Sequence, residues 1–207
     1  MRTDAYTPEA ICRCMGLPSF ERDPACTSAT EAVRLLLQPS FHPEVCITFA
    51  DGHVSVVNAR AMIWRQFEPS PMLTDRDDAR IGPEAFARLL ASMEPTKHVG
   101  AVPGIAVDGM PVELLHFQGG SSIVKAGRNA SGKGDFSAFV SLAITTAWEC
   151  ISSPYCRNAL SETAKYVGKN LPQVDEPVRK PTIETMVLGP EEDRVQLLEA
   201  LRRHHDG

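Results

Sequence analysis

The stretch VCITFADGHVSVV, residues 45–57, decides the fold class. Two runs rich in β-branched and aromatic residues, 45–50 and 53–57, flank the dipeptide Asp51-Gly52, which favours the type I′ turn of a tight hairpin. A two-residue connection is too short for a parallel crossover, so the two strands must be antiparallel. The sequence therefore predicts an antiparallel sheet that starts from this hairpin.

A meander and a buried helix complete the predicted core. Strands are expected at 104–107, 111–117 and 121–125, joined by turns at Asp108-Gly109 and Gly119-Gly120. Apolar residues at helical spacing cover most of the circumference of a helix from Asp135 to Ile151, so it should lie across one face of the sheet. We expect an α+β fold whose sheet has about five strands.

Peripheral helices are predicted from caps and from prolines in the first turn. The segment Ser28-Ala-Thr-Glu31 reads as a capping box, and the apolar run 33–37 that follows it predicts a helix ending before Pro39. The other expected helices begin at Thr7, Pro83, Ser153 and Pro190. Residues 1–168 are interpreted as one domain, 169–182 as a proline-rich linker, and 183–207 as a C-terminal strand and amphipathic helix that dock on the domain or on a partner.

Composition narrows the function classes. A formal net charge of −5 with no long basic run argues against nucleic acid as a partner. The most apolar stretch, 136–151, is shorter than the roughly 20 residues that a membrane span requires, and it contains polar residues. None of the six cysteines is in a C-x2-C spacing, which favours buried free thiols and a reducing, cytoplasmic location.

A glycine-rich loop between the last strand and the central helix is the most suggestive motif. Residues 127–134, GRNASGKG, approach the phosphate-binding loop G-x-x-x-x-G-K-[ST] but have Gly134 where the metal-binding hydroxyl should be. The segment Asn129-Ala-Ser-Gly132-Lys-Gly134 resembles the Q/R-x-x-G-x-G/A turn of the GNAT-type N-acetyltransferases, which binds the pyrophosphate of acyl-coenzyme A at a helix N-terminus. That resemblance implies acetyl-coenzyme A as cofactor, held by Asn129, Gly132, Lys133 and Gly134. The alternative is a flexible connection capped by Asp135.

Other polar residues form no catalytic or metal-binding pattern. Glu113 and His116 are three apart on one predicted strand, so they should face opposite sides of the sheet and cannot act as a pair. The acidic segment 74–78, TDRDD, is interpreted as a solvated loop, with a site for a hard cation as the alternative. We therefore expect no catalytic residues and no metal ligands.

The leading hypothesis is a small acidic protein of bacterial type that binds another protein and has no catalysis of its own. Immunity and inhibitor proteins are examples of that class. The terminal amphipathic helix predicted from 190 onward offers a surface for a partner or for a homodimer. An acyl-coenzyme A-dependent N-acetyltransferase is the alternative.

Overall fold

The computed structural model describes residues 6–63, 70–96 and 109–178. The chain divides into two compact units, Met1–Glu176 and Pro177–Gly207, and nearly all of the described residues belong to the first. The core of this first unit is one antiparallel sheet of six strands with helices packed on it. The predicted α+β class is confirmed, with slightly more strands than expected.

The sheet has the strand order β4-β3-β2-β1-β5-β6, and every neighbouring pair is antiparallel. The first four strands form a meander, and the chain then returns to the other side of β1 as a β5–β6 hairpin. Strand β1 is therefore central, while β4 and β6 are the edges. The strands are β1 (Glu31–Leu37), β2 (Val45–Ala50), β3 (His53–Ala59), β4 (Thr74–Arg80), β5 (Pro111–Gln118) and β6 (Ser121–Asn129).

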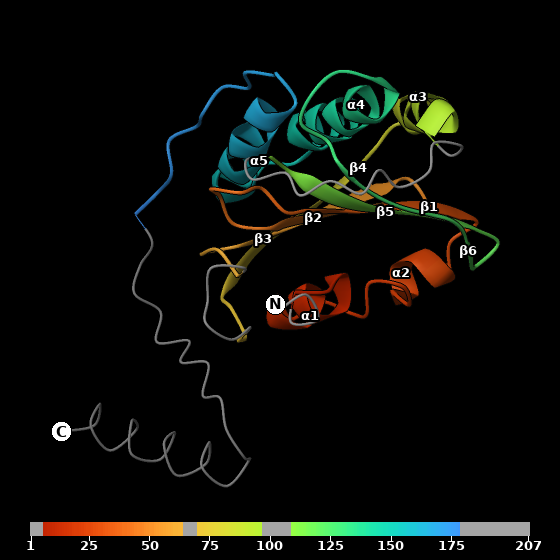
Figure 1. Ribbon diagram of the computed structural model, residues 1–207, viewed down its shortest axis with the longest axis horizontal. Helices are drawn as coiled ribbons and strands as arrows, with labels where there is room; N and C mark the ends of the chain where they lie inside the picture. The colour runs from red at the N-terminus through yellow and green to blue at the C-terminus, as the bar shows by residue number, and fades with distance from the viewer. Residues whose placement is uncertain (1–5, 64–69, 97–108, 179–207) are drawn as a thin grey trace, which may run out of the picture. The chain divides into compact units, whose positions relative to one another are not determined.

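Helices cover both faces of the sheet (Figure 1). One face carries α3 (Pro83–Met93), the short 3₁₀ helix η1 (Glu94–Thr96), α4 (Asp135–Cys150) and α5 (Pro154–Tyr166). The other carries α1 (Pro8–Cys14) and α2 (Pro24–Thr27). Side chains of the sheet alternate between two buried clusters, so that Leu35 packs toward α4 and Leu36 packs toward α1.

The local signals of the hairpin and of the central helix are confirmed. Asp51 and Gly52 both have positive φ, 46° and 76°, as a type I′ turn requires, and they join β2 to β3. Helix α4 begins at Asp135 as expected and buries Phe139, Val140 and other apolar side chains against the sheet. The predicted helices at Thr7, Pro83 and Ser153 are α1, α3 and α5.

The predicted helix over 33–37 is wrong, because this segment is β1 at the centre of the sheet. A central strand is covered on both faces, so its apolar residues run continuously rather than alternate, and that pattern does not separate a strand from a buried helix. Ser28 ends α2 instead of starting a helix, and Glu31 binds His116 of β5.

The acidic segment 74–78 is also not a loop, because it belongs to the edge strand β4. Two of its carboxylates are bound by the protein: Asp75 pairs with Arg60 at 3.1 Å, and Asp77 accepts the backbone N–H groups of Ser152 and Ser153, each at 2.6 Å. A strand so rich in charge is typical of a protected sheet edge.

Three predicted features lie outside the described residues: the strand at 104–107, Asp108 of the following turn, and the C-terminal helix. The described part of the predicted linker, 169–178, has no helix or strand. Val174 in this segment is nevertheless held to α5, because Asn158 exchanges two hydrogen bonds with its backbone, both at 2.8 Å. No helix among the described residues has the length and apolarity to cross a membrane.

Candidate functional site

The glycine-rich loop leaves the end of β6 in a defined conformation. The Asn129 side-chain oxygen accepts the N–H groups of Met110 and Ser131 at 3.1 and 2.9 Å, and the Ser131 hydroxyl accepts the Met110 N–H at 3.0 Å. The backbone of Ala130 also donates to the Met110 carbonyl at 2.8 Å. Residues 129–131 of the loop are therefore anchored to the start of β5.

The two glycines set the start of α4. Gly132 and Gly134 have φ values of 129° and 131°, which other residues rarely adopt, and a Cβ at either position would meet no atom within 4 Å. Gly134 is the N-cap, and no side chain caps this end of α4. The glycines are thus required by backbone conformation, and they leave space in front of the first turn of the helix.

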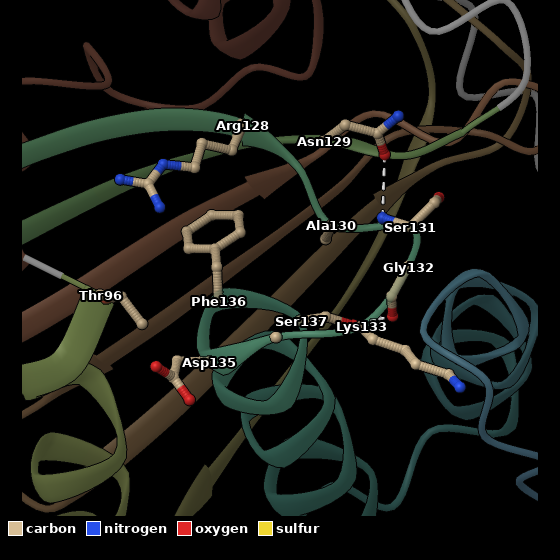
Figure 2. A pocket seen from close by; sticks show the side chains of 11 residues that line it. Thr96, Arg128, Asn129, Ala130, Ser131, Gly132, Lys133, Asp135, Phe136 and Ser137 are labelled. Atoms are coloured by element: carbon tan, nitrogen blue, oxygen red, sulfur yellow. Dashed lines mark hydrogen bonds between the residues drawn. The ribbon is translucent and has the colours of Figure 1, made fainter. Parts of the chain in front are cut away.

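That space is part of a pocket of about 250 Å³ (Figure 2). The guanidinium of Arg128 lies over the Phe136 ring, 5.5 Å from its centroid, while Lys133 extends away from Arg128 in this view. Nε and Nη2 of Arg128 are buried, and within the described chain they have no hydrogen-bond partner. The pocket is lined by Thr96 and by residues 128–137.

The chemistry of this pocket favours a carboxylate. Buried donors without a partner are rare in proteins, and a guanidinium pairs best with a carboxylate or a phosphate. The N-terminus of α4 adds a positive dipole end, whereas the Asp135 carboxylate in the first turn repels a highly charged anion. A single negative charge fits this balance better than a pyrophosphate.

The structure gathers all four residues that the sequence singled out, Asn129, Gly132, Lys133 and Gly134, around the pocket. Sequence reasoning missed Arg128, because β6 was expected to end near Lys125 and actually continues to Asn129. Alternate residues of a strand share a face, and Arg128 is opposite Val112 of β5, just as Ala126 is opposite Leu114. This alternation could have placed Arg128 on the face that α4 covers.

The outer edge of β6 leads into the same pocket. Among the described residues no strand pairs with this edge. Ile123 is 49% exposed on it, and the charged residues of the strand are Lys125, which is paired with Glu21, and Arg128. The edge is thus less charged than β4, in which only Thr74 and Ala79 are uncharged.

Glu113 and His116 lie on opposite faces of β5, as predicted. His116 is buried and its Nε2 is 3.0 Å from Glu31 Oε1, on the face of α4. Glu113 is half-buried on the other face, where burial raises the pKa of its carboxyl and Lys125 lowers it less. A Cβ on Gly127 would be 2.7 Å from both carboxylate oxygens, so this glycine makes room for Glu113.

A third group of polar residues is enclosed between α1, α2 and the sheet. Arg34, 0% exposed, forms an ion pair with Asp23 at 3.1 Å and donates to the carbonyls of Ser19 and Phe20 at 2.8 and 3.1 Å. The thiols of Cys12 and Cys46 belong to the same buried cluster on this face and interact with each other. Cys12 is thus next to Cys46 and not next to Cys14, its neighbour on the helix.

All six cysteines are free thiols, in agreement with the prediction from their spacing. Within the described chain no three or more His, Cys, Asp or Glu side chains are grouped so that they could hold a metal ion. Comparison of the sequence with protein-family models, with curated proteins and with solved structures finds no match.

Proposed function

We propose that this chain is a protein-binding domain without catalysis of its own, comparable in role to immunity and inhibitor proteins, and that its partner contributes an extended acidic segment to the edge of β6. The observation that carries the proposal is the edge of β6, which leads into a pocket where two buried donors of Arg128 have no acceptor among the described residues. Backbone pairing with an exposed edge gives affinity, and a pocket beside the edge gives specificity.

The two edges of the sheet differ in a way that supports this assignment. Strand β4 is almost fully charged, and its Asp77 is bound to the segment before α5. Strand β6 is longer, with nine residues, and it exposes Ile123. A long and weakly charged edge is a template for pairing with another chain, whereas charge discourages such pairing.

The positive charges on β6 favour an acidic segment as the partner of this edge. Strand β6 contains Lys125 and Arg128 but no acidic residue. If two copies paired antiparallel through the middle of β6, Lys125 would face its own counterpart, and like charges directly opposite each other are destabilising. An acidic strand avoids this repulsion, and one of its carboxylates can accept hydrogen bonds from Arg128.

A displayed library of random nine-residue segments tests the proposal directly. We expect selection on the full chain to enrich Asp and Glu alternating with β-branched residues, because these suit the cations and the extended conformation. Binding of the selected segments should fall at least tenfold in Arg128→Glu and in Ile123→Glu, because each change places a negative charge against the acidic segment. Arg76→Glu makes the same charge change on the exposed face of β4 and is the matched control, with unchanged binding.

Two outcomes would reject the assignment. Selected segments without acidic enrichment would remove the argument from charge. Segments that bind Arg128→Glu and Ile123→Glu as tightly as the parent protein, or that lose binding in Arg76→Glu, would place the site away from β6. Circular dichroism of each variant shows whether the fold is retained.

A second candidate, acyl-coenzyme A binding, is favoured by one observation: Gly132 and Gly134 open space at the uncapped start of α4. The chain after α4 continues into α5 and the segment 167–178 rather than into the further strand that the acetyltransferase resemblance implies. Acetyl-coenzyme A at a hundredfold excess over its dissociation constant would add about 2.7 kcal/mol to the free energy of unfolding if it binds. A melting temperature that acetyl-coenzyme A leaves unchanged rejects this candidate without affecting the first.

A further inference from the structure

The buried cluster beneath α1 contains two thiols in contact, and the sheet geometry explains why. In the β1–β2 register Leu36 is opposite Cys46 and Arg34 is opposite Thr48, so Arg34 and Cys46 are diagonal neighbours on one face. Helix α1 packs on this face and brings Cys12 against Cys46. Cys12 is 0% exposed and Cys46 is 2% exposed, so each thiol has the other as a neighbour within the core.

The surroundings make the two thiols unequal. The hydrogen bond from Cys12 and the charge of Arg34 lower the pKa of Cys46, although burial alone would raise it. For Cys12 the hydrogen bond to Cys46 and burial both raise the pKa. A thiolate is the nucleophilic form of cysteine, and a guanidinium beside it is the usual way to favour that form.

We propose that Cys12 and Cys46 are an oxidation site that forms a reversible disulfide between α1 and β2 when the protein meets a hydroperoxide. Cys46 is the thiolate that attacks, and Cys12 resolves the product. The site is independent of the proposed partner surface on β6, since it lies on the opposite face of the sheet from Arg128.

The reaction balances with the hydroperoxide as the only oxidant. The Cys46 thiolate attacks one peroxide oxygen, the O–O bond breaks, and the alkoxide takes up a proton to leave as an alcohol. Cys12 then loses its proton and attacks Cys46 Sγ; the S–O bond breaks and hydroxide leaves with that proton as water. The two sulfurs lose two electrons in total, and the peroxide gains two.

Burial sets the rate of this reaction. Neither thiol is accessible while α1 is docked, so oxidation requires local opening of this seven-residue helix. The N-cap Thr7 accepts the Ala10 N–H at 3.2 Å, and Thr7→Ala should increase the open population. We expect oxidation about fivefold faster in that variant, the ratio typical of a lost N-cap.

The sequence allows an unambiguous assignment of the linkage. Cleavage after Arg2, Arg13, Arg22, Arg34 and Arg60 by trypsin puts Cys12, Cys14, Cys26 and Cys46 on four different peptides. The reduced full chain is treated with hydrogen peroxide, its free thiols are alkylated, and the digest is analysed without reduction. We expect an intact-mass loss of about 2 Da and a cross-link between peptides 3–13 and 35–60 that reductant removes.

Cys26→Ala is the matched control, because Cys26 is a fully buried thiol of the same cluster. This variant should still form the link, whereas Cys12→Ala should not and should instead accumulate a sulfenic acid on Cys46 that dimedone traps. A wild-type digest with no 3–13 to 35–60 link, or with the link at another cysteine pair, overturns the proposal. So does a link that Cys26→Ala abolishes in a folded protein.

Discussion

Removal of the Arg34 guanidinium should be among the most damaging single changes in this protein. Arg34→Met keeps an unbranched side chain in the core but removes the partner of Asp23 and the donor to two loop carbonyls. Both partners of the ion pair are nearly inaccessible, with 0% and 11% of their side chains exposed. Breaking a buried pair from one side leaves an uncompensated charge and costs about 3–5 kcal/mol.

Urea unfolding at neutral pH measures this loss. For an m-value of about 2 kcal/mol per M, the midpoint should fall by about 1.5–2.5 M, which is a large share of the stability of an ordinary domain. Arg76→Met on the exposed face of β4 is the control and should change the free energy of unfolding by less than about 0.5 kcal/mol. Asp23→Asn should cost less in the Arg34→Met background than alone, because the orphaned charge is then removed. A loss below about 1 kcal/mol for Arg34→Met, or additive effects in the double variant, would refute this reasoning.

Three further changes test individual contacts. Asp77→Asn should cost about 1 kcal/mol, against almost nothing for the exposed Asp78→Asn. Partial burial raises the pKa of Asp77, but its hydrogen bonds to Ser152, Ser153 and Asp78 outweigh burial, so the pKa is lower than that of an ordinary carboxyl. The stabilisation from this carboxylate is therefore complete above the ordinary carboxyl pKa and is lost as pH falls through the lowered value. Urea midpoints measured at neutral and at acidic pH report this loss. Glu113→Gln should raise the melting temperature near pH 7, because burial raises the pKa of this carboxyl, and the gain should vanish below the ordinary carboxyl pKa. Trp148→Ala should cost about 2–3 kcal/mol by urea unfolding, less than a fully buried tryptophan, because its ring is half-buried against α5 and its Nε1 donates to Ser161 at 3.1 Å.

Elements defined by local chemistry could be predicted from the sequence. Asp51-Gly52 fixes both the turn type and the antiparallel pairing of its flanking strands, and no distant residue is needed to determine either. The apolar circumference of α4 likewise indicates burial wherever the helix packs. The glycines before α4 marked a special backbone conformation, which Gly132 and Gly134 adopt.

Elements defined by distant partners could not be predicted. Strand β1 resembled a capped helix, because its continuous apolar run reflects cover on both faces by elements up to a hundred residues away. Strand β4 was interpreted as a loop because its residues are mostly charged, and it is a strand because it pairs with β3. The role of Arg128 follows from its contact with Phe136, and the role of Arg34 follows from its ion pair with Asp23. Neither contact can be inferred before the sheet and its covering helices are placed.

The topology explains why the proposed binding edge is at β6. The meander that begins at the central strand β1 ends at the edge strand β4, and the charged side chains of β4 discourage pairing with another chain. The β5–β6 hairpin was added on the other side of β1, and its outer strand needs the same protection, yet β6 exposes Ile123 and carries only two cations. An edge of this composition promotes association unless a complementary strand covers it. Ile123→Glu should therefore increase the solubility of the isolated chain and, through repulsion between like charges, weaken its binding to an acidic segment.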